Sequence, residues 1–226
     1  MRRGRMKRMV VLCVLAGWCG GLQAQGWECK VLRGIQEHRT PAMDGTMSFV
    51  SNTLVLAPVT PGMQLLMGTQ MVGGTVGVTP EMQKRVALDG LQTLTALGLD
   101  MCVTTGLKYA VHRPRPYIQY ADTLQPLRRV RGYSFPSGHS SLAFATAVSL
   151  SMEYPRWYVV APTLLWATTV AYSRLYLGVH NPTDVLVGAL VGSASAYVAH
   201  RLVEKRREEL GLPEPKGIVV PLTIRF

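Results

Sequence analysis

Five apolar stretches, separated by short polar connections and one long loop, run along most of the chain. They lie at about 54–78, 87–108, 138–152, 158–177 and 184–203. Each is longer than an ordinary strand and rich in Ala, Leu, Met and Gly, a composition typical of helices. The long loop, at 109–137, is rich in Arg, Pro and Tyr. The pattern therefore predicts an all-α fold in a single main domain.

Taken one at a time, these stretches make weak membrane spans. The first contains Pro58 and Pro61, and the third is only about 15 residues long, whereas a comfortable span needs about 20. Their Thr, Ser and Gly residues suit close helix packing in a bilayer and in a soluble bundle alike. We expect a membrane-associated protein, with a soluble bundle as the alternative.

The N-terminus is organised like a secretory signal. Five basic side chains in the first eight residues precede an apolar run from Met9 to Leu22, and the small residue Ala24 follows. We expect a signal peptide at 1–24, cleaved after Ala24, or an uncleaved anchor helix. The remainder divides into a lead-in segment at 25–53, the main domain at 54–209 and a C-terminal tail at 210–226 with a strand-like end.

Composition and charge narrow the location and the partners. Hydrophobic residues make up 48% of the chain and charged residues 16%, against about 25% charged in ordinary soluble domains. The net charge of +11 falls to about +6 without the leader, and the basic residues that remain are spread among loops, so nucleic acid is not expected as a partner. We expect a bacterial cell-envelope protein, either in the inner membrane with its site facing the periplasm or in the periplasm itself.

Cysteines add little to this picture. Two of the four lie in the leader, which leaves Cys29 and Cys102. In an oxidising compartment the two thiols could pair, but their spacing does not indicate whether they do.

Chemistry is concentrated in three clusters at the ends of the predicted helices. The clusters run from Lys108 to Pro116, from Pro136 to His139, and through Ser173, Arg174, His180 and Asp184. Consecutive helices of a bundle run in alternating directions. The end of the second helix, the start of the third, the end of the fourth and the start of the fifth therefore lie at the same end. Helix count alone therefore predicts that the three clusters converge.

The converging residues suit a phosphate group. Lys108, Arg115 and Arg174 supply three positive charges, and arginine forks match phosphate oxygens. Ser137 and Gly138 lie at a predicted helix N-terminus, where free N–H groups and the helix dipole favour an anion.

The two histidines suit transfer of that phosphate. Asn181 and Pro182 predict a helix start after His180, so Asp184 can reach back to one imidazole nitrogen and leave the other as a nucleophile. His139 can then act as the general acid. The same three side chains could instead hold a metal ion, but three neighbouring cations would oppose it, and we expect no metal and no cofactor.

Three nearby residues are interpreted as structural. His112 and Arg113 lie inside the first cluster but not at its key positions, and Asp100 falls within the second predicted helix. For Asp100 we expect a hydrogen bond inside the bundle, although a lone carboxylate in a span is often functional.

Across about 87–203 the chain closely resembles the type 2 phosphatidic acid phosphatase superfamily, which includes bacterial acid phosphatases and vanadium haloperoxidases. The pattern K-x6-RP, PSGH and SR-x5-H-x3-D is complete here. The resemblance implies a bundle of five to six core helices, with His180 as the nucleophile that forms a phosphohistidine and Asp184 as its orienting group. It also implies that His139 protonates the leaving group and later activates water, while the five phosphate-binding residues are Lys108, Arg115, Ser137, Gly138 and Arg174.

The expected function is therefore a metal-independent phosphatase, most simply of lipids. Its substrate could be phosphatidate, phosphatidylglycerol phosphate, an isoprenoid diphosphate or lipid A, since apolar helices beside a cationic pocket suit a greasy tail and a charged head. The alternatives are a soluble periplasmic acid phosphatase, a vanadate-dependent haloperoxidase and a phospholipid-binding protein without turnover.

Overall fold

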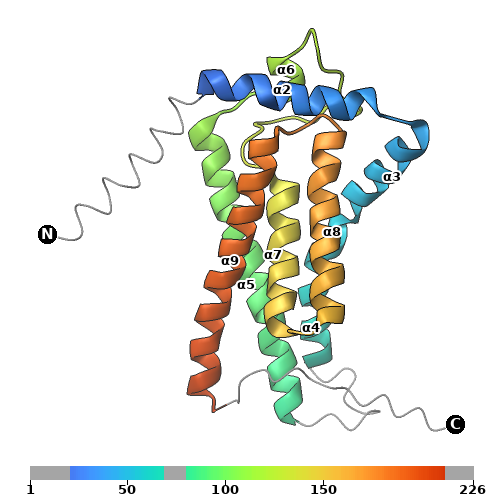
Figure 1. The fold of residues 1–226 in the computed structure, drawn as a ribbon. Coiled ribbons are helices and arrows are strands. Elements are labelled where there is room, and N and C mark those ends of the chain that lie inside the picture. Colours follow the sequence, from blue (N-terminus) through green and yellow to red (C-terminus); the bar gives the residue numbers. More distant parts are fainter. Residues whose placement is uncertain (1–20, 69–79, 212–226) are drawn as a thin grey trace, which may run out of the picture.

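The computed structural model describes residues 21–68 and 80–211, and within these ranges every regular element is helical (Figure 1). The elements are α2 (Gly21–Glu37), α3 (Pro41–Asn52), the 3-10 turn η1 (Thr53–Val55), α4 (Leu56–Gly68), α5 (Pro80–Val111), α6 (Pro116–Gln119), α7 (Gly138–Glu153), α8 (Trp157–Tyr176) and α9 (Pro182–Glu209). The all-α prediction is confirmed, and each of the five apolar stretches contributes one helix. Most of the predicted leader and the strand-like end of the tail lie outside the described residues.

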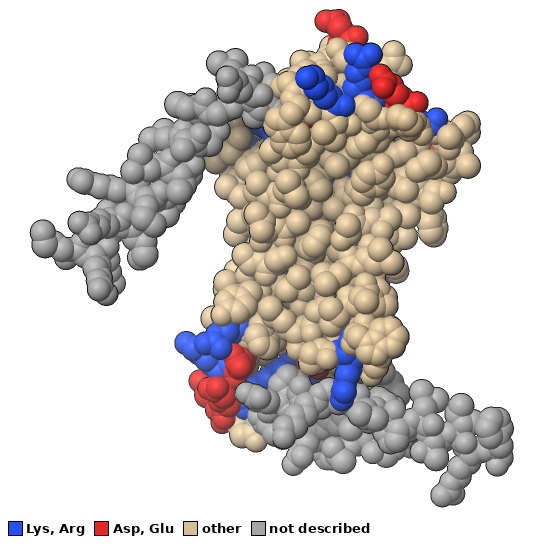
Figure 2. All heavy atoms as spheres, viewed as in Figure 1, with Lys and Arg blue, Asp and Glu red and all other residues tan. Residues whose placement is uncertain are grey.

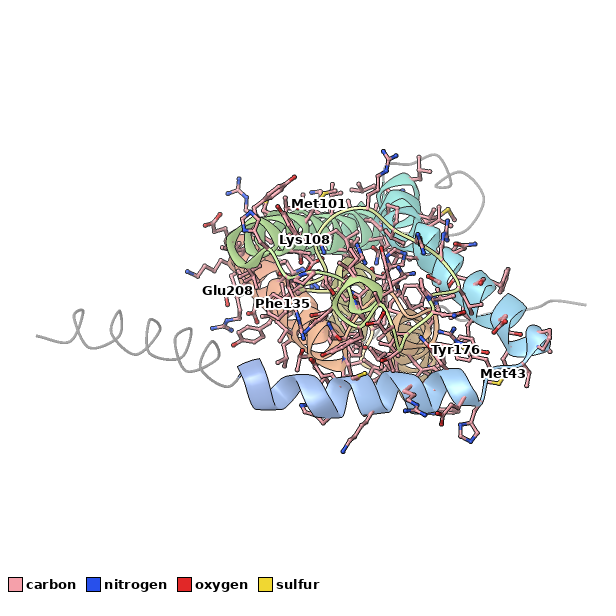
Figure 3. All side chains as sticks on the ribbon, turned by 90° about the horizontal axis from the view of Figure 1, so that it is seen from above. Met43, Met101, Lys108, Phe135, Tyr176 and Glu208 are labelled. Atoms are coloured by element: carbon pink, nitrogen blue, oxygen red, sulfur yellow. The ribbon has the colours of Figure 1, made fainter. Side chains whose placement is uncertain are left out.

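Four long helices, α5, α7, α8 and α9, stand side by side, and α7 packs against the other three (Figure 1). The shorter α4 packs against α5 towards the lower end of the view, and α3 packs against α8. The helix α2 lies across the upper end of the bundle, roughly perpendicular to the long helices. Seen from above, α2 runs along one side of the bundle (Figure 3), so the lead-in segment borders the end where the three sequence clusters were predicted to meet.

Local sequence signals set the helix ends that matter for this arrangement. Ser137 caps α7, its Oγ accepting from the backbone N–H of Ser140 at 3.4 Å, as Ser commonly does at this position. Pro182 is the first residue of α9, where its fixed φ and missing N–H cost nothing. At the end of α5, His112 takes a left-handed φ of 52° and turns the chain into the long loop.

Glycines let α9 approach α7 closely. A Cβ at Gly188 would lie 2.5 Å from Ser137 O, and one at Gly192 would lie 2.0 Å from Ser141 O. Both obstacles are backbone atoms, which cannot rotate away, so these positions require glycine. The spacing is the small-xxx-small arrangement of closely packed membrane helices.

On the face shown in Figure 2, the surface of the bundle is nearly free of Lys, Arg, Asp and Glu between two charged ends. Leu165, Leu186 and Leu190 are each more than 60% exposed on it. Two segments, Gln83–Gln119 and Pro182–Glu209, are long and apolar enough to cross a bilayer. Together these features indicate a membrane location.

A polar cluster ties the helices together at the lower end. Glu153, at the end of α7, accepts hydrogen bonds from Gln64 Nε2 of α4 at 2.6 Å and from Thr93 Oγ1 of α5 at 2.8 Å. Beside it, Arg207 of α9 forms a buried ion pair with Asp89 of α5. Buried polar groups need such partners, and these ones fix the end of the bundle opposite the predicted site.

Candidate active site

The three sequence clusters meet at the upper end of the bundle, the end that α2 borders on one side (Figures 1 and 3). They come from the end of α5, the start of α7, the end of α8 and the start of α9. This is the arrangement predicted from the number of helices. Figure 3 looks down on this end and labels Lys108 and Phe135 there.

Arg115 lies just before α6 and is 5% exposed. Its guanidinium is held by backbone carbonyls, with Nε donating to Gly132 O at 3.0 Å and Nη1 to Val179 O at 2.9 Å. The same Nη1 lies 3.4 Å from Nε2 of His180. Loop carbonyls therefore fix a cation directly against the predicted nucleophile.

Arg174, near the end of α8, is only 2% exposed. Its Nη1 donates to Ser51 Oγ of α3, while its buried Nε has no hydrogen-bond partner among the described residues. Buried guanidinium donors are costly to leave unpaired. An anion in this pocket would satisfy the Nε donor.

Lys108 completes the set of cations from the last turn of α5. Its Nζ donates to Tyr133 O at 3.1 Å and to Pro136 O at 2.8 Å, which ties α5 to the loop before α7. Within the part of the chain that the structure describes, Lys108, Arg115 and Arg174 form no salt bridge with a carboxylate. Three positive charges without direct neutralisation make the pocket attractive to an anion such as phosphate.

Ser137 and Gly138 lie at the start of α7. The backbone N–H of Ser137 donates to Asp184 O at 2.9 Å, so the start of α7 is bonded to the start of α9. Gly138 is the first helical residue, and a Cβ there would meet only Thr104 Cγ2 at 3.9 Å. The N-terminal turn of α7, which carries His139, is thus bonded to the turn of α9 that carries Asp184.

His180 lies in the turn between α8 and α9 and is 3% exposed. Its Nδ1 is 3.7 Å from Asp184 Oδ2, and its Nε2 faces Nη1 of Arg115. Arginine has only donors, so the nitrogen facing it is the unprotonated acceptor. The proton of the neutral ring is therefore on Nδ1, towards the carboxylate, and the lone pair of Nε2 accepts from Arg115.

Burial is the main influence on the protonation of His180 and His139, which lie at the upper, charged end of the bundle. Burial, reinforced by Arg115 and Arg174, lowers the pKa of His180 to about 4, although Asp184 acts in the opposite direction. Burial also lowers the pKa of His139 to about 3, followed by the charge of Arg174 and the neighbouring His180. Both rings are therefore neutral at neutral pH.

Asp184 is fully buried and is held by groups that the motif pattern did not indicate. Its Oδ1 accepts from Arg113 Nη1 at 2.7 Å, and its Oδ2 accepts from the backbone N–H of Asn181 at 2.8 Å and from Ser134 Oγ. Arg113, which was interpreted from the sequence as structural, thus bonds directly to the predicted orienting group.

Glu28 of α2 also enters the site, because it pairs with Arg113 at 2.5 Å. It lies 155 residues from Thr183, which it also contacts. No local sequence signal could have found it.

Other residues near the motifs have structural partners. Asp100 accepts from Ser141 Oγ at 2.9 Å inside the bundle, as expected. His112 stacks edge-on against Tyr133, with ring centroids 4.5 Å apart. Cys29 and Cys102 are both free thiols. Within the described ranges, no three His, Cys, Asp or Glu side chains are grouped in a way that could hold a metal ion.

Comparison with known proteins agrees with this geometry. The family model of the PAP2 superfamily matches residues 89–208. An undecaprenyl-diphosphatase of Sulfolobus acidocaldarius is 25% identical over 193 residues, 84% of this chain and 85% of that protein. A lipid A 4'-phosphatase of Bacteroides thetaiotaomicron is 33% identical over 90 residues, 38% of this chain and 40% of that protein, so the chain spans less than half of this second relative.

A solved structure shares the fold. The transmembrane PAP2 type phosphatidylglycerolphosphate phosphatase of Bacillus subtilis superposes with a TM-score of 0.65 at 24% identity, covering 88% of this chain and 96% of that one. The family match covers more than half of the 226 residues and includes all three clusters. The chain therefore belongs to the PAP2 superfamily, and it is a phosphoric ester hydrolase.

Proposed function

We propose that this protein hydrolyses lipid phosphates, either monoesters or diphosphates, through a phosphohistidine formed on His180 without a metal ion. The observation that carries the proposal is the placing of His180 Nε2 at 3.4 Å from Arg115 Nη1, with its other nitrogen facing Asp184. A lone pair is thereby held where a bound phosphoryl group would meet it. Such positioning with electrostatic stabilisation is the main source of catalysis in phosphoryl transfer.

In the first step, Nε2 of His180 forms a bond to phosphorus while the bond from phosphorus to the leaving oxygen breaks. The electron pair of that bond goes to the leaving oxygen, which takes a proton from His139. Arg115, Arg174, Lys108 and the N-terminal turn of α7 stabilise the charge on the phosphoryl oxygens. Asp184 stabilises the positive charge that develops on the imidazole of His180.

In the second step, His139 accepts a proton from water as the water oxygen bonds to phosphorus. The bond between phosphorus and Nε2 breaks, its electrons return to His180, and inorganic phosphate leaves. The net reaction consumes one water and returns both histidines to their starting states. The proton needed by His139 in the first step arrives with the substrate, whose anionic phosphate offsets the nearby cations and raises the pKa of His139.

A lipid substrate is favoured by the surroundings of the pocket. The cations lie at the end of helices that expose large hydrophobic side chains such as Leu165, Leu186 and Leu190. In the view of Figure 2 the surface between the two charged ends is nearly free of charged residues. A substrate with acyl or isoprenoid tails could remain in the bilayer while its phosphate enters this end. The relatives named above act on an isoprenoid diphosphate and on lipid A, which supports the same class.

The proposed setting is a bacterial inner membrane with the site facing the periplasm. The lower end carries basic residues, among them Lys84, Arg156, Arg201 and Arg206, in keeping with a cytoplasmic position. The upper end is also basic, which phosphate binding explains. A leader that directs this end across the membrane fits the same orientation.

The test is phosphate release by the purified full chain in detergent and EDTA, from phosphatidate, an isoprenoid diphosphate and a soluble aryl phosphate. Release from a lipid that survives chelation and disappears in His180→Ala is the expected result. His38→Ala, a change at an exposed histidine just after α2, is the matched control and should retain activity.

Two other outcomes would change the assignment. Preference for the soluble ester would identify a periplasmic acid phosphatase. Activity that requires a metal ion, or persists without His180, would overturn the proposed mechanism.

A further inference from the structure

Arg113 joins two buried carboxylates from opposite ends of the sequence. Its Nη1 donates to Asp184 Oδ1 at 2.7 Å and its Nη2 to Glu28 Oε2 at 2.5 Å. Glu28 is 1% exposed and Asp184 is fully buried. Ion pairs of this kind are strongly coupled, because removing one member leaves the other buried without compensation.

Glu28 also binds the first turn of α9. Its Oε1 accepts from Thr183 N at 3.3 Å and from Thr183 Oγ1. The N–H groups of a first helical turn lack partners within the helix, and a carboxylate there is favoured by the helix dipole. Glu28 therefore anchors α2 to the turn that carries Asp184.

Asp184 is oriented by this anchor. With Oδ1 held by Arg113, and Oδ2 by Asn181 N, the carboxylate has one orientation, in which Oδ2 faces His180 Nδ1 at 3.7 Å. Among the described residues, Arg113 and Glu28 form no hydrogen bond or ion pair with His180, so any effect on the proposed nucleophile passes through Asp184.

We propose that Glu28 and Arg113 are positioning residues that set both the orientation and the effective charge of Asp184 beside His180. The inference rests on the proposed function only for its kinetic consequences. The alternating order Glu28, Arg113, Asp184, His180 makes a specific electrostatic prediction, which does not depend on turnover. Removing the positive charge of Arg113 makes the electrostatic potential at His180 more negative. Removing the negative charge of Glu28 makes that potential less negative.

Several other charged or titratable groups lie near His180 and stay constant in this comparison. They are Arg115 before α6, Arg174 of α8 and His139 of α7, with Lys108 of α5 acting near Asp184. Within the described part of the chain, Glu28 bonds to Arg113 and Thr183 and to none of these groups. Single changes at Glu28 or Arg113 therefore leave this background in place.

The first measurement is the pKa of His180 by NMR of the full chain with isotopically labelled histidine in detergent, assigned with His180→Ala. Relative to the unchanged protein, Arg113→Gln should raise the pKa of His180. Glu28→Gln should lower that pKa below its value in the unchanged protein. The double variant should lie between the two. Glu37→Gln, at an exposed residue of α2 that pairs with Arg33, is the control and should leave this pKa unchanged.

The second measurement is steady-state hydrolysis of phosphatidate by the same proteins. Each single variant should lower kcat by about 10- to 100-fold with KM nearly unchanged, as expected of a misplaced catalytic group. Arg113→Lys should restore part of the loss because it keeps the charge. A positioning role also predicts that the two single effects are not additive.

The outcomes separate this proposal from the proposed function. Opposite pKa changes without phosphatase activity would support the positioning role and overturn the assigned reaction. Equal or absent pKa changes in folded variants would overturn the positioning role, whatever the activity. If Glu28→Gln does not fold, the test rests on Arg113→Gln alone. A rise in the pKa of His180 in that variant would support the positioning role, and no rise would overturn it.

Discussion

Asp184 Oδ2 lies 3.7 Å from His180 Nδ1 while it accepts a backbone N–H of Asn181 at 2.8 Å. The carboxylate is thus fixed by the helix turn it belongs to, and the imidazole faces it across slightly more than hydrogen-bond distance. A small rotation of the ring would close this gap. Positive charge on His180 during phosphoryl transfer would favour that movement.

Replacing Asp184 by Asn should therefore impair catalysis far more than folding. Asn keeps the size of the side chain and an oxygen for Arg113, but it loses the charge that stabilises a cationic imidazole. We expect kcat for phosphatidate to fall by about 10²- to 10⁴-fold. Initial rates, with thermal unfolding measured in parallel, provide the check.

One outcome for Asp184→Asn would contradict this prediction. A fall of less than about threefold, a difference below roughly 1 kcal/mol, in a variant with unchanged thermal unfolding would mean that Asp184 does not assist His180. In that case its buried partners serve the helix turn alone.

The separate roles of the two histidines can be tested with leaving groups. His139→Ala should abolish hydrolysis of phosphatidate, whose alkoxide needs a proton. Nitrophenyl phosphate has a leaving group that departs without one, so its first step should survive, with a burst of about one nitrophenol per enzyme. His180→Ala should lose both activities, because it removes the nucleophile itself.

Accumulation of phosphoenzyme is the accompanying signature. Without His139 to activate water, phosphohistidine should persist and be detected by its acid lability and by mass spectrometry. Equal loss on both substrates, with no burst, would assign His139 to binding rather than to proton transfer.

The pH dependence follows from the two lowered pKa values. His180 must be neutral to attack, and its pKa of about 4 means that activity is lost only as pH falls through about 4. His139 is neutral in the free enzyme above its pKa of about 3. The proton it donates therefore arrives with the monoanionic substrate, whose second pKa is about 6.

We thus expect kcat/KM to peak between these limits, in the mildly acidic range, when measured in EDTA across that range. An unshifted histidine would give an acid limb near 6.5 instead. An acid limb near that value would show that burial does not tune the nucleophile in solution.

Much of this arrangement could be predicted from the sequence because the signals are local. Pro182 and Ser137 mark helix starts, and the order of five apolar stretches is enough to bring Lys108, His139 and His180 to one end. The fold class and the convergence of the clusters depend on nothing else.

The rest depends on contacts between distant segments. Glu28 and Ser51 belong to the lead-in segment, which has no sustained periodicity, yet they bond to Arg113 and Arg174. The contact between Ser51 and Arg174 joins residues 123 positions apart. Such pairs depend on how α2 and α3 dock on the finished bundle, and no spacing within either partner encodes that.

Gly192 should be intolerant of even a methyl group. A Cβ there would lie 2.0 Å from Ser141 O and 2.9 Å from Ala145 N, both backbone atoms of α7. Gly192→Ala should separate α9 from α7, lower the thermal midpoint in detergent and reduce activity, because α9 carries Asp184. Overpacking of this kind costs about 1–3 kcal/mol or more.

Gly98→Ala is the matched control, since a Cβ at Gly98 meets nothing within 4 Å. Alanine has the higher helix propensity, so this change should be neutral or stabilising by up to about 1 kcal/mol. Equal effects of the two substitutions would mean that the close approach of α7 and α9 does not limit stability.

Arg128 offers a way to distinguish diphosphates from monoesters. It lies in the long loop, where its Nη1 donates to Asn52 Oδ1 at 3.3 Å, next to the Ser51 that holds Arg174. Its charge also contributes to lowering the pKa of His139, so it acts on the side of the proposed general acid. The leaving group of an isoprenoid diphosphate is a phosphate, which carries negative charge as it departs past His139 and Arg128. The leaving group of phosphatidate is a lipid alcohol, which departs neutral.

Arg128→Gln should therefore lower kcat/KM for an isoprenoid diphosphate by about tenfold, the effect of losing one charge-assisted hydrogen bond. Hydrolysis of phosphatidate should change by less than about threefold, because its leaving oxygen is protonated by His139 and needs no cation. Arg129→Gln, the next exposed arginine of the same loop, controls for the general loss of positive charge near the pocket. Equal losses on both substrates would mean that Arg128 attracts any phosphate to the pocket, since a group that acts only at entry cannot distinguish the two leaving groups.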